Sequence, residues 1–234
     1  MKKTFLLSIL ILWGALSASA QLYRYLETKD GLSSRRVIAI EKDNKGYMWF
    51  LTQEGIDRYN GKQFKFYPLT DGKLTLQQFP NLNQLHIDLQ DDIWITGKNG
   101  YVFKYNRGQD KYDLIMNFAD SLKTTRRLPL TYTGLDRNDQ LWLCTRNEQY
   151  IYFTQSGKTV RLDSPIKEEI TYIEQGKGNR YFIGTNQSII PAQLKGNRII
   201  PDESSILEGI HRIQHIHYHV PTDRLLIGTM ADGF

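Results

Sequence analysis

Four of the five histidines in this 234-residue chain lie close together, and their spacing is the first feature that could support chemistry. They occur in the stretch HRIQHIHYHV as His211, His215, His217 and His219. On a β-strand, alternate side chains point to the same face, so His215, His217 and His219 would share one face. Imidazoles placed in this way can bind zinc. The alternative is the polar face of an innermost strand that lines a central channel, and no further ligand with suitable spacing is evident. We expect no other cofactor.

Paired acidic residues are a second candidate for chemistry. Glycoside hydrolysis needs two carboxyl groups that face each other across a cleft, about 5–9 Å apart. The acidic pairs here are neighbours in expected turns, where adjacent side chains point apart: Asp91-Asp92, Glu168-Glu169 and Asp202-Glu203. The sequence also lacks a serine nucleophile elbow, a P-loop and the H-E-x-x-H motif. We therefore expect no catalytic residues and no enzymatic activity in this chain.

The elements that would position these residues repeat along the chain. A short apolar strand centred on one anchor residue follows a polar turn and reaches a Thr within three residues. The anchors recur at intervals of 40 to 48 residues, at Trp49, Trp94, Trp142, Phe182 and Leu226. After the first anchor, the alternating patterns predict further strands over residues 56–59 and 64–67. After the second anchor, they predict strands over residues 101–105 and 111–114.

Four short antiparallel strands in each repeat of about 40–45 residues are typical of a β-propeller blade. A large flat anchor would bury about 150–250 Å² between neighbouring sheets. We therefore expect an all-β propeller of four-stranded antiparallel blades over residues 21–234, with about five blades and the last incomplete. In the fifth blade the register stays open. Counting back from Leu226 places His217 where the first blade has Ile40, whereas a turn longer by one residue places Ile216 there.

The repeat also resembles a known family. Residues 43–61, DNKGYMWFLTQEGIDRYNG, resemble the repeat of two-component-regulator propellers. Tyr25-Leu26, followed by Asp30-Gly31-Leu32-Ser33-Ser34 and Val37, is similar to the start of the periplasmic sensor region of Bacteroides-type hybrid two-component histidine kinases. The resemblance implies a module that senses a glycan fragment and controls polysaccharide-utilisation genes. It implies as partners an oligosaccharide, further propeller blades and downstream domains of the same longer chain, and a second copy in a homodimer of the intact protein.

The end of the sequence departs from this family pattern. The chain stops at Phe234 within the fifth repeat, and neither a membrane helix nor a kinase motif follows. We therefore expect an N-terminal fragment of a longer sensor. Two other classes of function stay open, namely a secreted propeller enzyme that acts on glycans and a propeller that binds another protein.

Ligand contacts in propellers usually come from loops at one mouth of the ring. The basic pair Arg35 and Arg36 precedes the first expected innermost strand, and these two residues are our candidates for ligand binding. The single Cys144 lies within the apolar stretch LWLCT and is expected to be a small buried hydrophobic residue.

The first twenty residues read as a secretory signal peptide. Lys2 and Lys3 precede an apolar run over residues 5–16, and Ala18-Ser19-Ala20 matches a cleavage site. The sequence therefore predicts export to the periplasm. Removal of this segment lowers the net charge from +5 to +3. So small a positive charge does not favour a nucleic-acid partner.

Overall fold

The structure is a computed structural model that describes residues 25–68, 82–123, 129–211 and 213–230. The predicted signal peptide lies outside the described residues and stays a prediction. No helix among the described residues is both long and apolar enough to span a membrane.

The described strands form successive antiparallel sheets in which neighbours along the chain are neighbours in the sheet. We call these sheets blades 1 to 5. Blade 1 contains β1 (Val37–Lys42), β2 (Met48–Thr52), β3 (Ile56–Tyr59) and β4 (Phe64–Tyr67). Blade 2 contains β5 (Leu82–Ile87), β6 (Ile93–Gly97), β7 (Tyr101–Asn106) and β8 (Lys111–Asn117). Blade 3 contains β9 (Tyr132–Leu135), β10 (Gln140–Cys144), β11 (Gln149–Phe153) and β12 (Lys158–Arg161).

Blade 4 contains β13 (Ile170–Gln175), β14 (Arg180–Thr185), β15 (Ser188–Lys195) and β16 (Arg198–Pro201), and the short β17 (Leu207–Glu208) also pairs with β15. Blade 5 is described as two strands, β18 (Ile213–His219) and β19 (Arg224–Thr229). Helical structure among the described residues is limited to η1 (Thr28–Asp30), α2 (Phe118–Ser121) and η3 (Glu203–Ser205).

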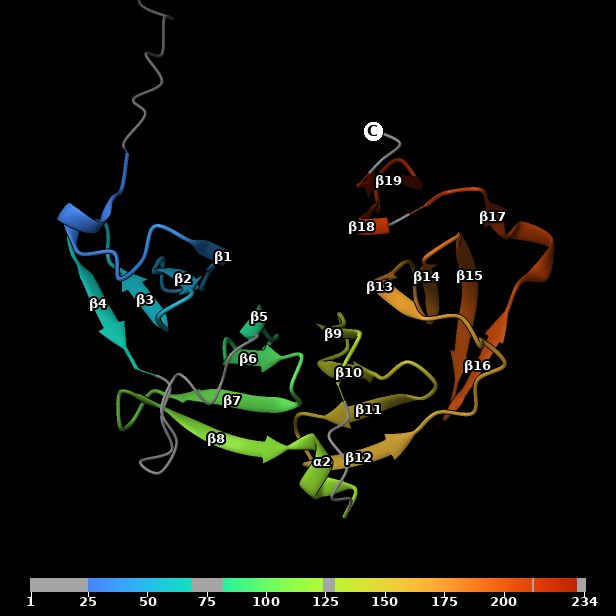
Figure 1. Cartoon of the computed structure of the whole chain (residues 1–234), viewed down its shortest axis with the longest axis horizontal. Coiled ribbons are helices and arrows are strands. Elements are labelled where there is room, and N and C mark those ends of the chain that lie inside the picture. The colour runs from blue at the N-terminus through green and yellow to red at the C-terminus, as the bar shows by residue number, and fades with distance from the viewer. Residues whose placement is uncertain (1–24, 69–81, 124–128, 212, 231–234) are drawn as a thin grey trace, which may run out of the picture.

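The blades follow one another around an open arc (Figure 1). The innermost strands β1, β5, β9, β13 and β18 lie nearest its centre, and β4, β8, β12 and β16 lie on its outside. This arrangement confirms the predicted class, a propeller of four-stranded antiparallel blades. The strands expected over residues 56–59 and 64–67 have these bounds in the structure.

The anchors occupy equivalent places in consecutive blades. Trp49, Trp94 and Trp142 lie on the second strand of blades 1, 2 and 3, and all three are almost completely buried. Each one packs into the interface with the next blade, as where Trp142 contacts Tyr181 at a ring-centroid distance of 5.1 Å. Leu226 holds the same place in blade 5 but is 61% exposed, because no described sheet packs against that face.

An aspartate that the repeat pattern did not identify fixes each Trp anchor; it is buried at Asp43 and Asp88 and half-buried at Asp136. Asp43, Asp88 and Asp136 each lie six residues before the tryptophan, and their Oδ2 atoms accept the indole N–H at 2.8–3.0 Å. The other carboxylate oxygen accepts two backbone N–H groups of the turn that follows, as Oδ1 of Asp88 does from Gln90 and Asp92. One side chain therefore holds both the turn and the anchor. The recurrence of Asp six residues before each Trp was the signal for it.

The same turns join neighbouring blades. The backbone N–H of Asn44 donates to Oδ1 of Asp91 at 2.8 Å, and that of Leu89 donates to Oδ1 of Asp139 at 2.9 Å. Asp91 and Asp139 adopt left-handed backbone conformations, with φ of 64° and 58°, which Asp tolerates better than most residues. In the next interface Arg137 N–H donates instead to Oε1 of Gln175 at 2.7 Å. These bonds fix the blades relative to one another and so position the innermost strands.

Candidate functional site

The strand pairing defines two series of equivalent positions on the innermost strands. Directly opposite the anchors lie Glu41, His86, Gly134, Glu174 and His217. Two residues earlier on each innermost strand, and so on the same face, lie Ala39, Gln84, Tyr132, Tyr172 and His215. Paired residues share a face of the sheet. We call the polar members of these two series the axial wall: Glu41, Gln84, His86, Tyr132, Tyr172, Glu174, His215 and His217.

The axial wall is polar because each innermost strand has two different faces. Alternating residues on the opposite face are apolar and buried against the preceding blade, such as Leu85, Ile173 and Ile216. Along β18 the burial alternates in the same way, with Ile216 and Tyr218 buried and His215, His217 and His219 exposed. The innermost strands therefore carry polar groups on the face that looks toward the next blade, while their other face packs against the preceding blade.

Tyr172 connects several members of the axial wall. Its ring lies 5.6 Å from that of Tyr132 and 4.7 Å from that of His215, measured between centroids. Burial raises the pKa of Tyr172 to about 12, and the nearby charges of Glu174 and Glu41 contribute to this rise. The hydroxyl therefore stays protonated at neutral pH and can donate a hydrogen bond.

Glu174 is held in place by groups from both adjacent blades. Its Oε1 accepts a hydrogen bond from the backbone N–H of Tyr218 at 3.0 Å and an ion pair from Arg137 at 3.4 Å. Glu41, by contrast, is accessible to solvent as a whole, but the surroundings of its carboxyl partly desolvate it and so raise its pKa. The wall thus contains one fixed acceptor and one accessible acid.

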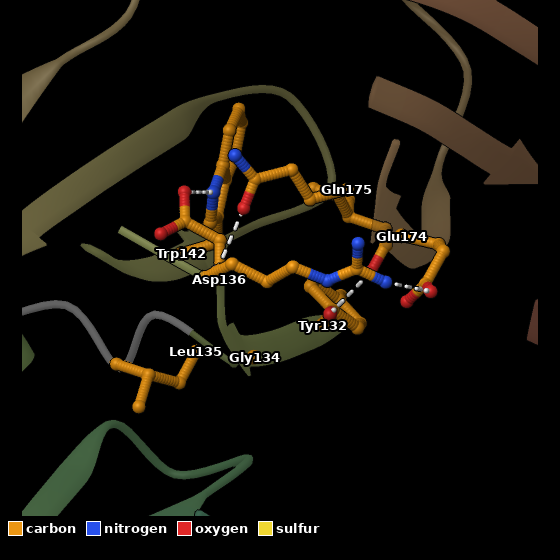
Figure 2. Close-up of a pocket in the computed structure, with 9 residues that line it drawn as sticks. Tyr132, Gly134, Leu135, Asp136, Trp142, Glu174 and Gln175 are labelled. Carbon is orange, nitrogen blue, oxygen red and sulfur yellow. Dashed lines mark hydrogen bonds and ion pairs between the residues drawn. The ribbon is translucent and has the colours of Figure 1, made fainter. Parts of the chain in front are cut away.

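A glycine changes the wall in blade 3. A Cβ on Gly134 would lie 1.9 Å from the hydroxyl oxygen of Tyr132. Only Gly at this position therefore leaves room for the tyrosine side chain to lie over the backbone of residue 134. The Tyr132 hydroxyl donates to the carbonyl oxygen of Ile173 at 2.9 Å. Beside them lies a cavity of about 40 Å³, also bounded by Asp136, Glu174 and Gln175 (Figure 2). This volume suits one or a few water molecules rather than a larger ligand.

His86 is a member of the axial wall with one buried polar atom that lacks a partner in the described part of the chain. Its Nε2 is buried and has no hydrogen-bond partner among the described residues. Burial lowers the pKa of His86 to about 4, so the ring is neutral at pH 7. This histidine was not among the predicted site residues, because it lies apart from the other four in the sequence. Its place opposite Trp94 becomes apparent only from the strand register.

The structure places the three predicted metal-binding histidines on one strand face, as the alternation predicted. Ile216 pairs with Ile227 as Ile40 pairs with Phe50, so the longer turn is the correct alternative for the register. The His215 ring packs on Tyr172, and Nδ1 of His219 lies 2.7 Å from the hydroxyl of Thr222. Within the described parts of the chain, no group of three His, Cys, Asp or Glu side chains is arranged to hold a metal ion. A site on His215, His217 and His219 stays a prediction, which zinc calorimetry tests.

Arg35 and Arg36 lie immediately before β1 and are both exposed. The backbone of Arg36 accepts a bond from Gln53 N–H at 3.2 Å, which fixes the chain but leaves the guanidinium group outside the sheet. The structure does not bring either arginine into the axial wall, and their role in ligand binding stays a prediction.

The accessible part of the axial wall consists of Glu41, His215 and His217, with the partly buried ring of Tyr172 beside His215. Such a surface suits a polar, hydroxylated ligand. Cys144, a possible nucleophile, is buried in β10, and burial raises the pKa of its thiol. Cys144 lies outside the axial wall, and its buried thiol is poorly suited to act as a nucleophile.

Comparison with known proteins identifies the fold. No protein-family model and no curated protein matches the chain. Among solved structures, it is similar to the extracellular domain of the hybrid two-component system BT3049 from B. thetaiotaomicron, with 19% identity and a TM-score of 0.67. That match covers 89% of this chain and 29% of the other. The shared fold is the β-propeller.

Two further solved structures are similar at lower scores. The extracellular domain of the B. thetaiotaomicron hybrid two-component system BT4673 matches with 16% identity and a TM-score of 0.53, over 88% of this chain and 34% of the other. Virginiamycin B lyase from Staphylococcus aureus matches with 13% identity and a TM-score of 0.56, over 83% of this chain and 70% of the other. The propeller thus resembles both sensor domains and an enzyme, and it spans about a third or less of the two sensor domains.

Proposed function

We propose that this chain is a non-enzymatic, periplasmic ligand-sensing module of a hybrid two-component signalling protein. The observation that carries the proposal is the match of 89% of the chain to the extracellular domain of such a system. The likeness to a lyase is weaker, with a TM-score of 0.56 against 0.67. Moreover, the one thiol in the chain is buried and has a raised pKa.

We further propose that the ligand is an oligosaccharide and that its binding controls polysaccharide-utilisation genes. The axial wall supports this choice because its hydroxyl, carboxylate, amide and imidazole groups can exchange hydrogen bonds with sugar hydroxyls. The ring of Tyr172, which is only partly buried, offers an apolar face beside these groups. A ligand that binds one arrangement of domains more tightly would shift the population toward it, which is how such a module would signal.

The ends of the arc suggest where the rest of the proposed protein would attach. Ile38 and Ile40 are exposed on β1, and Leu226 and Met230 are exposed at the other end. Exposed apolar faces on sheets usually mark an interface. Because the chain spans only 29% of the sensor domain of BT3049, we propose that further blades of the same longer chain cover these faces.

Three experiments test the proposed function. Alkaline phosphatase fused after residue 234 is active only when exported, so an inactive fusion would exclude a periplasmic module. In bacteria that carry the gene, its deletion should abolish induction of polysaccharide-utilisation transcripts on one glycan and leave the other responses intact. Chromatography of oligosaccharides incubated with the purified chain should show no new products, because a product would instead support the enzyme alternative.

A further inference from the structure

An open cleft of about 370 Å³ lies between blades 3 and 4 and shares no residue with the axial wall. Its residues come from the β9–β10 turn and the start of β10, from β11 and β12, and from the β13–β14 turn, β14, the end of β15 and the β15–β16 turn. Its volume falls within the range of small-molecule sites, roughly 300–1,000 Å³. The cleft is therefore large enough to be considered as a second site.

The lining of this cleft is amide-rich and uncharged. Four side-chain amides and two aromatic rings contribute to it: Asn138, Gln140, Asn179, Asn197, Phe153 and Tyr181. None of the lining residues is acidic or basic. An amide carries both donor hydrogens and an acceptor oxygen, which is what a hydroxyl group requires from its partners.

Two features indicate that the cleft is prepared for a ligand. Tyr181 is buried, and its hydroxyl donates to Oδ2 of Asp136 at 2.8 Å, so its ring is held in one orientation. In contrast, Oε1 of Gln140 is buried and has no hydrogen-bond partner among the described residues. Burying a polar atom without a partner costs free energy. A ligand hydroxyl that donates to Gln140 would remove this cost.

We infer that the cleft binds an uncharged sugar residue of the oligosaccharide sensed by the module, an inference that rests on the proposed function. The amides hydrogen-bond its hydroxyl groups, and Phe153, which is only partly buried, offers a ring for its apolar face. The uncharged lining disfavours a carboxylated or sulfated sugar, because a desolvated anion would lack a cationic partner there. The cleft thus selects for neutral glycans.

Isothermal titration calorimetry of the full chain tests the inference. The neutral probes are cellohexaose, xylohexaose, mannohexaose and arabinohexaose, and the charged probes are hexagalacturonate and a chondroitin sulfate hexasaccharide. We expect at least one neutral probe to bind. Loss of a hydrogen-bonding amide in Gln140→Leu or in Asn197→Ala should raise its Kd about tenfold, which corresponds to about 1.4 kcal/mol. Gln53→Leu changes an exposed glutamine on blade 1 and should leave the Kd unchanged.

The variants keep the inference falsifiable even if one of them folds poorly. Asn197 lies in an exposed turn after Gly196, so Asn197→Ala should retain the urea unfolding curve of the parent chain. Neutral binding that neither variant weakens would overturn the cleft assignment. Binding of charged probes alone would also overturn it, but would leave the sensor function intact. Failure of every probe would overturn the cleft assignment, and unchanged transcription in the deletion strain would in addition reject the proposed function.

Discussion

The indole N–H of Trp142 donates to Oδ2 of Asp136 at 3.0 Å, and the Tyr181 hydroxyl of the next blade donates to the same oxygen at 2.8 Å. One carboxylate therefore holds an anchor in blade 3 and an aromatic ring of blade 4. Because Tyr181 also lines the amide-rich cleft, the bond that stabilises the interface also shapes a candidate binding surface.

The Asp–Trp pairs should contribute measurably to stability. In Asp88→Asn, one acceptor oxygen is replaced by a donor group, so either the Trp94 indole or the turn amides lose their partner. A hydrogen bond to a charged group is worth about 1.5–3 kcal/mol, and Asp88 is buried. We expect urea denaturation to show a loss of about 3 kcal/mol in the free energy of unfolding.

Asp120→Asn is the matched control for this variant. Asp120 is exposed in the short helix α2, so its substitution should change the free energy of unfolding by less than about 0.5 kcal/mol. Equal effects of the two substitutions would mean that the Asp–Trp bond does not stabilise the blade.

The close approach of Tyr132 to Gly134 predicts a steric effect. In Gly134→Ala, the new Cβ would meet the tyrosine hydroxyl at 1.9 Å, so the ring must leave its position. Overpacking of this kind costs about 1–3 kcal/mol. We expect urea denaturation of Gly134→Ala to show a loss in this range.

A double-mutant cycle separates this contact from a general effect of alanine. In a Tyr132→Val background, Gly134→Ala should cost much less, because the colliding ring is absent. Gly108→Ala is a suitable control, since its Cβ would meet only Oδ1 of Asn106, at an ordinary 3.5 Å. If the cost of Gly134→Ala is the same with and without Tyr132, the contact is not its cause.

The sequence patterns were sufficient to predict the blades, because each blade is formed by one continuous stretch of the chain. The alternating pattern predicted strands β3 and β4 with the bounds that the structure confirms. The spacing of the aromatic anchors likewise predicted the equivalent positions of Trp49, Trp94 and Trp142 in consecutive blades. Each depends on residues within one repeat, where the two-residue period of a strand is directly visible.

The axial wall and the cleft could not be predicted in this way because they join residues from different blades. Glu41 and Tyr172 lie in blades 1 and 4, and their relation depends on the curvature of the arc. The cleft likewise needs the long β15, whose turn brings Asn197 near Gln140. Nothing in the local pattern of either segment specifies this contact.

The buried thiol predicts a kinetic test of cooperativity in blade 3. Cys144 is fully buried in β10, and burial raises the pKa of the thiol, so little reactive thiolate is present or accessible. We expect dithionitrobenzoate to label it only after unfolding, with a urea dependence that matches the fluorescence transition. Rapid labelling in the absence of urea would show that blade 3 opens locally.

His86 predicts how stability depends on pH. Burial lowers its pKa to about 4 in the folded chain, whereas an unfolded histidine titrates near 6.5. Between these values the unfolded chain binds the extra proton, so the stabilisation is present above pH 6.5 and is lost as the pH falls toward 4. We expect urea denaturation to show a decrease of roughly 1–2 kcal/mol in the free energy of unfolding between pH 7 and pH 5.

Two histidine variants test whether His86 causes this pH dependence. His86→Gln should remove this part of it, whereas His219→Gln, at an exposed position on β18, should retain it. An unchanged pH profile in His86→Gln would show that another group causes the acid sensitivity.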